Sequence, residues 1–314
     1  MKKLIVIDGH AILHRAYHAL PPLTAKDGTI TNAVYGFFSM LLKILKDVKP
    51  DCVVICFDRP KPNFRQSLYV GYQAHRPAMD SDLIPQIKLV RESLKKAKVQ
   101  IFEVDGYEAD DLIGTISKQV VEKDKNMQVI IVSGDRDLLQ LVNSHVLMIA
   151  PITGLTKMIL FDAEKVKEKY GLEPHQFIDY KALVGDSSDN YPGVSGIGPK
   201  TASDLLKKYH TFEGVFKHLK ELPENMALKL AQDAEQAALA KKLATIEINA
   251  PIKIKIEDCS VDKIDKKKLT EFFNKMGFKS LLLRLNEQKK VQKVEKKKEK
   301  KNVKKEESGQ LGLL

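Results

Sequence analysis

The sequence has few cysteines, and this shortage excludes a class of protein. Only three cysteines occur among 314 residues. Cys52 and Cys56 fall on one expected strand, where four steps of ~3.3 Å hold them too far apart for a disulfide. Cys259 is distant in sequence. A disulfide-stabilised secreted domain is therefore not expected, and a reducing cytoplasm is the simplest compartment.

Long hydrophobic runs are also absent. No segment approaches the ~20 apolar residues that cross a bilayer, so we expect no membrane segment. The N-terminal apolar run stops at Asp8, short of the ~7 to 15 residues of a signal peptide, and is interpreted as a first strand. The length, the hydrophobic fraction of 43% and the mean hydropathy of -0.25 suit a globular protein of one or two domains.

Negative charge is in the minority. The formal net charge is +11, and nearly half of it lies in residues 286–307, which hold ten lysines and five glutamates. The remainder is still basic, which indicates a polyanionic partner. The segment rich in lysine and glutamate has little to bury, so we expect a flexible tail over residues 286–314.

Apolar runs alternate with helix-period stretches. The runs rich in Val and Ile lie at 3–7, 52–57, 99–104 and 128–132, and the helical stretches at 33–48, 82–97 and 109–123. This order predicts an α/β fold with a mostly parallel central sheet and helices on both faces. We expect this domain to span residues 1–160 and a helical subdomain to span 161–285.

The connection between the second and third expected strands is longer than a crossover helix needs, which indicates an insertion at residues 59–97. Eight cations alternate there with Phe64, Tyr69 and Tyr72. This composition suits a single-stranded nucleic acid, with Tyr72 and Arg76 as candidate contacts. A solvated amphipathic lid is the alternative.

Nine acidic residues follow the expected strands or lie in a later polar segment. The carboxyl ends of parallel strands share one edge of a sheet, so we expect the acids after the strands to meet there. The last two are three positions apart and would share a face if helical. The nine are Asp8, Asp58, Glu108, Asp110, Asp111, Asp135, Asp137, Asp186 and Asp189.

Carboxylates gathered in one crevice repel one another unless a cation lies between them. Because all nine candidate ligands are carboxylates and none is a Cys or His, Mg²⁺ or Mn²⁺ fits better than zinc. Two such ions about 4 Å apart would support in-line hydrolysis of a phosphodiester without a nucleophilic side chain. Asp8 or Asp135 alone would be typical of a helix N-cap, a reading that nine acids together disfavour.

A glycine-rich turn at 193–198 precedes an expected helix. Gly196, Gly198 and Lys200 would present a phosphate-binding helix N-terminus, with Thr201 as a further candidate DNA contact. The spacing is too short for a Walker loop, and ordinary turn chemistry is the alternative.

Seven segments together resemble the 5′-nuclease domain of bacterial DNA polymerase I, in the flap endonuclease family. They are VIDGHAILHRAYHAL, VYGFFSMLLKIL, CFDRPKPNFR, GYEADDLIGT, SGDRDLLQL, YGLEP and GDSSDNYPGVSGIGPKTA. The resemblance covers about residues 1–285. It implies a PIN-like fold, a helical arch over the flap strand, and removal of 5′ flaps and RNA primers from branched DNA. It also implies that the glycine turn is a helix-hairpin-helix-type motif, which holds K⁺ in some members. We expect a monomer.

The resemblance also implies roles for the acids. Asp8, Asp58, Glu108 and Asp110 would serve mainly one Mg²⁺, and Asp135, Asp137, Asp186 and Asp189 a second. Asp111 lies nearby, and Asp110 and Asp111 are the acids that we name as catalytic.

One position departs from the family pattern. Where the family has Y-K-x-x-R, this chain reads YQAHR, so Gln73 replaces a lysine that would hold and polarise the scissile phosphate. An amide donates a hydrogen bond but carries no charge, and Arg76 or Arg65 is the candidate replacement cation. We therefore expect a nuclease of reduced activity.

The last residues, GQLGLL, resemble a peptide that binds the bacterial sliding clamp, through Gln310, Leu311, Leu313 and Leu314. A flexible tether of this kind would raise the local concentration of the enzyme at replication sites. A plain frayed terminus is the alternative.

Three other functions are alternatives to a nuclease that acts on 5′ flaps. The first is a catalytically weakened scaffold that binds branched DNA on the clamp. The second is an acidic-pocket ribonuclease of a smaller related fold, for which the insertion and the glycine turn would have no use. The third is phosphotransfer through an aspartyl intermediate, which would need one acid rather than nine.

Overall fold

The computed structural model describes residues 1–154 and 157–287. Nearly all of the expected tail, including the clamp-like peptide, lies outside these residues. Within them, no helix has both the length and the apolar character that crossing a membrane requires. All three cysteines are buried and free.

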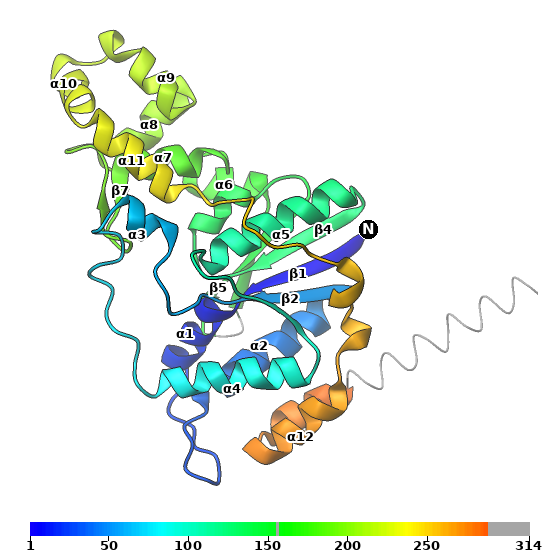
Figure 1. Cartoon of the computed structure of the whole chain (residues 1–314). Coiled ribbons are helices and arrows are strands. Elements are labelled where there is room, and N and C mark those ends of the chain that lie inside the picture. Colours follow the sequence, from blue (N-terminus) through cyan, green and yellow to red (C-terminus); the bar gives the residue numbers. More distant parts are fainter. Residues whose placement is uncertain (155–156, 288–314) are drawn as a thin grey trace, which may run out of the picture.

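A six-stranded sheet occupies the first part of the chain, in the order β3-β2-β1-β4-β5-β6. Figure 1 shows β2, β1 and β4 side by side in this sheet. All neighbouring strands are parallel except β5 and β6. The strands are β1 (Lys2–Asp8), β2 (Cys52–Cys56), β3 (Gln100–Phe102), β4 (Met127–Val132), β5 (Val146–Thr153) and β6 (Lys157–Phe161). The prediction of a mostly parallel sheet is confirmed, while β5 and β6 were not anticipated.

Helices cover both faces of the sheet, as predicted. Successive residues of a strand point to opposite faces, so Leu4 and Val6 join one core cluster and Ile5 and Ile7 the other. The first cluster includes α5 (Ala109–Lys123), and the second includes α1 (Gly9–Ala19), α2 (Asn32–Val48), α4 (Leu83–Lys96) and α12 (Lys266–Met276).

The insertion at 59–97 divides into two parts. Its first part contains the short helix α3 (Phe64–Leu68), which begins at a capping box of Asn63 and Gln66. Its second part is α4, whose apolar residues are buried against α2 and the sheet. α4 serves as the crossover helix between β2 and β3, so residues 59–82 are the part of the insertion that precedes this helix. A helical arch over residues 59–97 stays a prediction.

The second part of the chain is mainly helical and projects from the sheet (Figure 1). Its helices are α6 (Ala163–Tyr170), α7 (Gln176–Val184), α8 (Pro199–Tyr209), α9 (Phe212–Lys217), α10 (Glu224–Gln232) and α11 (Ala234–Ala244). A small hairpin of β7 (Gly185–Asp186) and β8 (Tyr191–Pro192) interrupts them between α7 and α8.

After α11 the chain returns to the sheet domain and runs along α5. Asp111 Oδ1, Thr115 Oγ1 and Gln119 Oε1 accept hydrogen bonds from backbone N–H groups of residues 247–254, at 2.9, 3.0 and 3.1 Å. The three acceptors are four residues apart, so they share one face of α5. We call residues 245–256 the return strap.

Candidate active site

The acidic residues gather at the carboxyl ends of the strands. Asp8 ends β1, Asp58 follows β2, Glu108 and Asp110 begin α5 beyond β3, and Asp135 follows β4. Asp137 begins the 3-10 helix η1 (Asp137–Leu141), close to Asp186 and Asp189 of the β7–β8 turn. We name Asp8, Asp58, Glu108 and Asp110 the first carboxylate group, and Asp137, Asp186 and Asp189 the second carboxylate group.

Local hydrogen bonds fix the acids of the first group. Asp8 caps α1 by accepting from the Ala11 N–H at 2.9 Å, and its other oxygen accepts from Ser133 Oγ at 2.8 Å. Asp58 accepts from the Ala109 N–H at 2.7 Å. The N-cap interpretation therefore holds for Asp8, but the same carboxylate also belongs to the acidic group.

Burial and mutual repulsion make Asp8, Glu108 and Asp110 reluctant to ionise. Asp58 differs, because its contact with His10 lowers its pKa despite burial. Burial, reinforced by the charge of Asp58, raises the pKa of Asp8 to about 6. Burial, with the charges of Asp135 and Asp8, raises the pKa of Asp110 well above its usual value. Burial raises the pKa of Glu108 to about 7 despite the nearby Arg65. These groups lack sufficient positive charge, which a bound cation would supply.

The second carboxylate group could hold one divalent ion. One oxygen from each of its three residues lies within 4.8 Å of the others. Asp186 and Asp189 do not share a helix face. Asp186 ends β7 and Asp189 lies in the turn that follows, where Asp186 Oδ1 accepts from the Ser188 N–H at 2.7 Å. Lys181 of α7 forms ion pairs with both Asp137 and Asp186.

Gln73 connects the two groups. Its Nε2 donates to Glu108 Oε1 at 3.0 Å and to Asp189 Oδ1 at 2.9 Å, from a backbone with φ of 56°. Tyr72 is buried beside it, with its hydroxyl donating to Glu108 Oε2 at 3.1 Å and its ring stacked on Tyr191. The ring of Tyr72 is therefore not an exposed stacking platform in this conformation.

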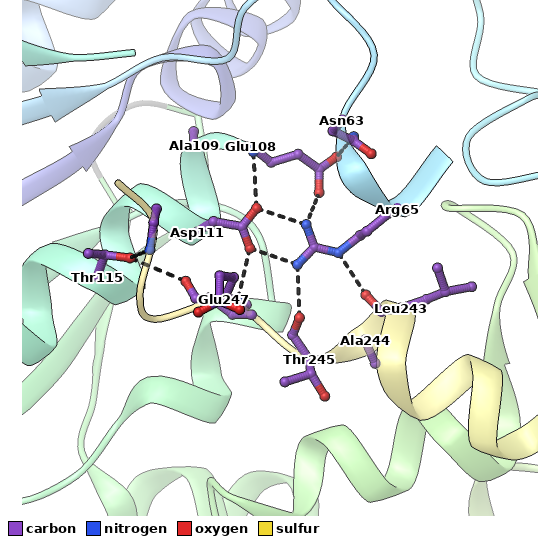
Figure 2. A network of polar contacts seen from close by, with 12 residues as sticks. Asn63, Arg65, Glu108, Ala109, Asp111, Thr115, Leu243, Ala244, Thr245 and Glu247 are labelled. Atoms are coloured by element: carbon purple, nitrogen blue, oxygen red, sulfur yellow. Dashed lines mark hydrogen bonds and ion pairs between the residues drawn. The ribbon is translucent and has the colours of Figure 1, made fainter. Parts of the chain in front are cut away.

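Arg65 and Asp111 form a buried ion pair (Figure 2). Arg65 is 2% exposed and donates to both oxygens of Asp111, at 2.9 and 2.8 Å, and to Glu108 at 2.8 Å. It also donates to the carbonyls of Leu243 and Thr245, both at 2.9 Å. The expectation that Arg65 serves a phosphate and Asp111 a metal is therefore corrected, because each is saturated by the other and by backbone groups.

Arg76 is the cation of the insertion that lies beside the second carboxylate group. It lines a pocket of about 540 Å³ together with Asp135 and the second carboxylate group, and Ser203 of α8 lies on the same pocket. Other insertion cations are paired: Arg59 and Lys61 with Asp105, and Arg91 and Lys95 with Glu103.

The glycine turn leads into α8, as expected. Gly196 has φ of 74°, a left-handed conformation that favours glycine, and Gly198 is the N-cap of the helix. Gly196, Gly198 and Lys200 are exposed, while Thr201 is half-buried in the first turn. The backbone of this N-terminus therefore faces solvent, in an element that also contributes to the pocket.

Two residues at the site, Ser133 and Lys181, were not predicted from the sequence. Ser133 lies in the SGDRD segment, and its hydroxyl donates a hydrogen bond to Asp8. A hydroxyl residue directly after a predicted strand could have indicated this role. Lys181 lies five residues before Asp186, at the end of a helix, and its pairing with Asp137 depends on the fold.

Both carboxylate groups suit a hard divalent cation. Their ligands are oxygens, and neighbouring donors hold Asp8, Asp58 and Glu108 of the first group. The repulsion that raises the pKa of Asp110 shows that the charge of this group is incompletely balanced.

Comparison with known proteins points to one family. The family model described as 5′-3′ exonuclease, N-terminal resolvase-like domain, matches residues 3–171. The model described as 5′-3′ exonuclease, C-terminal SAM fold, matches residues 172–267.

Curated relatives agree with these matches. The 5′-3′ exonuclease of Aquifex aeolicus is 38% identical over 282 residues, which are 90% of this chain and 94% of that protein. DNA polymerase I of Caldicellulosiruptor bescii is 41% identical over 292 residues, which are 92% of this chain and 34% of that protein. This chain thus spans about a third of the length of such polymerases.

A similar fold occurs in T5 5′-exonuclease, solved with divalent metal ions (zinc) bound. Its TM-score is 0.66 at 20% identity, covering 87% of this chain and 99% of that chain. The catalytic core of Rad2, solved in complex with a DNA substrate, has a TM-score of 0.57 at 16% identity and covers 90% of this chain and 92% of that chain. At these identities the likeness shows the fold.

Proposed function

This chain belongs to the 5′-3′ exonuclease family, and from that premise we propose that it hydrolyses phosphodiester bonds at 5′ flaps. The observation that carries the proposal is the position of the acids at one edge of the sheet, which we call the rim. They come from three strand ends, the start of α5 and the β7–β8 hairpin. Branched DNA with a single-stranded 5′ flap and RNA–DNA primer junctions are the proposed substrates. Removal of flaps and primers in replication and repair is the proposed role.

We assign Mg²⁺, with Mn²⁺ as a substitute, to the two carboxylate groups. Bound there, the pair of ions would activate a water molecule and stabilise the leaving oxygen. The chain itself would keep the ligands in place, through Ser133 at Asp8 and through Asn63 and Arg65 at Glu108. Arg76 would bind the phosphate at the pocket, and Gln73 would donate a hydrogen bond without charge.

DNA would be held on the side of the pocket that α8 forms. Backbone N–H groups at the start of α8 and the ammonium of Lys200 would contact phosphates of the duplex without reading sequence. We also propose that the glycine turn binds K⁺ and that the ion strengthens duplex binding. Duplex affinity should then be higher in KCl than in NaCl at equal ionic strength, and equal affinities would contradict the proposal.

A labelled 5′-flap substrate tests the main proposal. In Mg²⁺ the full chain is expected to release the flap, and in EDTA it should not. An Asp135→Asn, Asp137→Asn variant should fall to the level measured in EDTA. The control is Asp105→Asn, which removes an exposed acid paired with Arg59 and Lys61 and should retain activity. An intact flap with both wild type and double variant, in Mg²⁺ and in Mn²⁺, would refute the assignment.

A scaffold that binds branched DNA without cutting it is the second candidate. The burial of Arg65 favours it, because that arginine cannot replace the charge missing at Gln73. Tight flap binding with no product in either metal would support the scaffold.

We also propose that the final peptide tethers the enzyme to the bacterial sliding clamp in the cytoplasm, and that the chain is a monomer. Loss of clamp binding in a chain ending at residue 308, measured by surface plasmon resonance, tests the tether. Light scattering of the full chain tests the monomer.

A further inference from the structure

Lys181 places a positive charge inside the second carboxylate group. The residue lies in the last turn of α7, and its side chain is 19% exposed. Its ammonium forms ion pairs with Asp137 of η1 and with Asp186 of the β7–β8 hairpin. One side chain therefore joins three elements at the site.

The same two carboxylates would be needed by a divalent ion. Asp137 and Asp186 are two of the three residues whose carboxylate oxygens lie within 4.8 Å of one another. Two cations that share ligands repel each other, and the repulsion is strong where water is partly excluded. Binding of an ion at this group is therefore disfavoured while the ammonium stays in its present place.

The first carboxylate group is balanced differently. Its cationic contacts are Arg65 at Glu108 and, when protonated, His10 at Asp58. In the part of the chain that the structure describes, no ion pair with a lysine or arginine reaches Asp8 or Asp110. A divalent ion arriving at these two acids has no resident cation to displace.

We propose that Lys181 is the resident counter-ion of the second carboxylate group, so that a divalent ion binds there only by displacing its ammonium, and binds more weakly than at the first group. This inference rests on the proposed function. In the metal-free protein the ammonium keeps the hairpin against η1, so the ligands stay near one another. Lys181 is thus a positioning residue that sets the order and strength of metal binding.

Calorimetric titration of the full chain with Mn²⁺ tests the inference. Wild type is expected to show one tight and one weak event. Lys181→Met should tighten the weak event by about tenfold or more, because the competing charge is gone, and leave the tight event unchanged. Lys181→Arg should keep the weak event weak. A second event that is unchanged or weaker in Lys181→Met would overturn the inference.

Lys241 provides a matched control. Its ammonium also bridges two acids, Asp179 at 2.8 Å and Glu213 at 2.7 Å, but outside both carboxylate groups. Lys241→Met removes the same charge and should leave both Mn²⁺ events unchanged. Tightening of the weak event in this control would attribute the effect to net charge and would also overturn the inference.

A measurement on wild type does not depend on the folding of any variant. With ¹⁵N-labelled lysine and Mg²⁺, the Nζ resonance of Lys181 should shift during the second binding event and not the first. A resonance that stays constant through both events would contradict displacement. If no divalent ion binds at all, the proposed function fails. If one ion binds and no second event occurs, this inference fails together with the assignment of an ion to the second group, while cleavage of the labelled flap still tests the proposed hydrolysis.

Discussion

The buried pair of Arg65 and Asp111 allows a sharp prediction about stability. Asp111 is fully buried, and Arg65 supplies two of the hydrogen bonds to its carboxylate. Arg65→Met leaves that carboxylate charged, buried and without its cation, and also removes the donors to Glu108 and to two carbonyls. Stranding one partner of such a pair costs about 3 to 5 kcal/mol. We expect that loss in the free energy of unfolding, measured in EDTA by urea titration followed by circular dichroism.

Two further variants separate the buried charge from other effects. Arg59→Met breaks an exposed pair with Asp105 and should leave the free energy of unfolding close to that of wild type. Adding Asp111→Asn to Arg65→Met removes the stranded charge, so the double variant should be more stable than Arg65→Met alone. The reasoning fails if Arg65→Met is within about 1 kcal/mol of wild type, or if the double variant is the less stable of the two.

Three other predictions follow from the site. In EDTA, Asp8 keeps its proton up to about pH 6 in the folded state and only to about 3.8 when unfolded, so it contributes to a fall in stability as pH rises through that window. Melting temperatures from pH 4 to 7 should therefore fall less steeply in Asp8→Asn, and an equal slope would contradict this. Gln73→Lys should raise the single-turnover rate of flap cleavage in Mg²⁺ about tenfold or more, by adding charge at the phosphate, and an unchanged rate would show that charge there is not limiting. Lys200→Ala should weaken duplex binding and lower the slope of log affinity against log salt by about 1, measured by fluorescence anisotropy; Lys268→Ala on α12 should do neither.

The sequence predicted the sheet and the position of the acids at its edge, because both follow from the pattern of buried strands. Parallel strands covered on both faces appear as continuous Val and Ile runs, and acids placed just after such runs share an edge. β5 is harder to predict from the sequence, because a proline such as Pro151 is unusual in a central strand. The structure accommodates this proline where the register between β5 and β6 shifts.

The roles of adjacent acids could not be read from their order. Asp110 and Asp111 are neighbours in sequence, but successive helix residues point about 100° apart. Asp110 therefore lies among the charges of the rim, while Asp111 faces Arg65 and the return strap. The burial of Tyr72 likewise depends on Tyr191, a partner more than a hundred positions away.

The return strap bears on how this protein would come apart. It follows the helical subdomain in the chain, yet its backbone is bonded to α5, and α12 beyond it packs on the opposite face of the sheet. A protease cut just after α11 would not yield two separable halves, because the downstream piece remains clasped to the upstream one. We therefore expect the sheet domain and the helical subdomain to unfold in a single thermal transition, in which the acids of the rim and the surface of α8 lose their structure together.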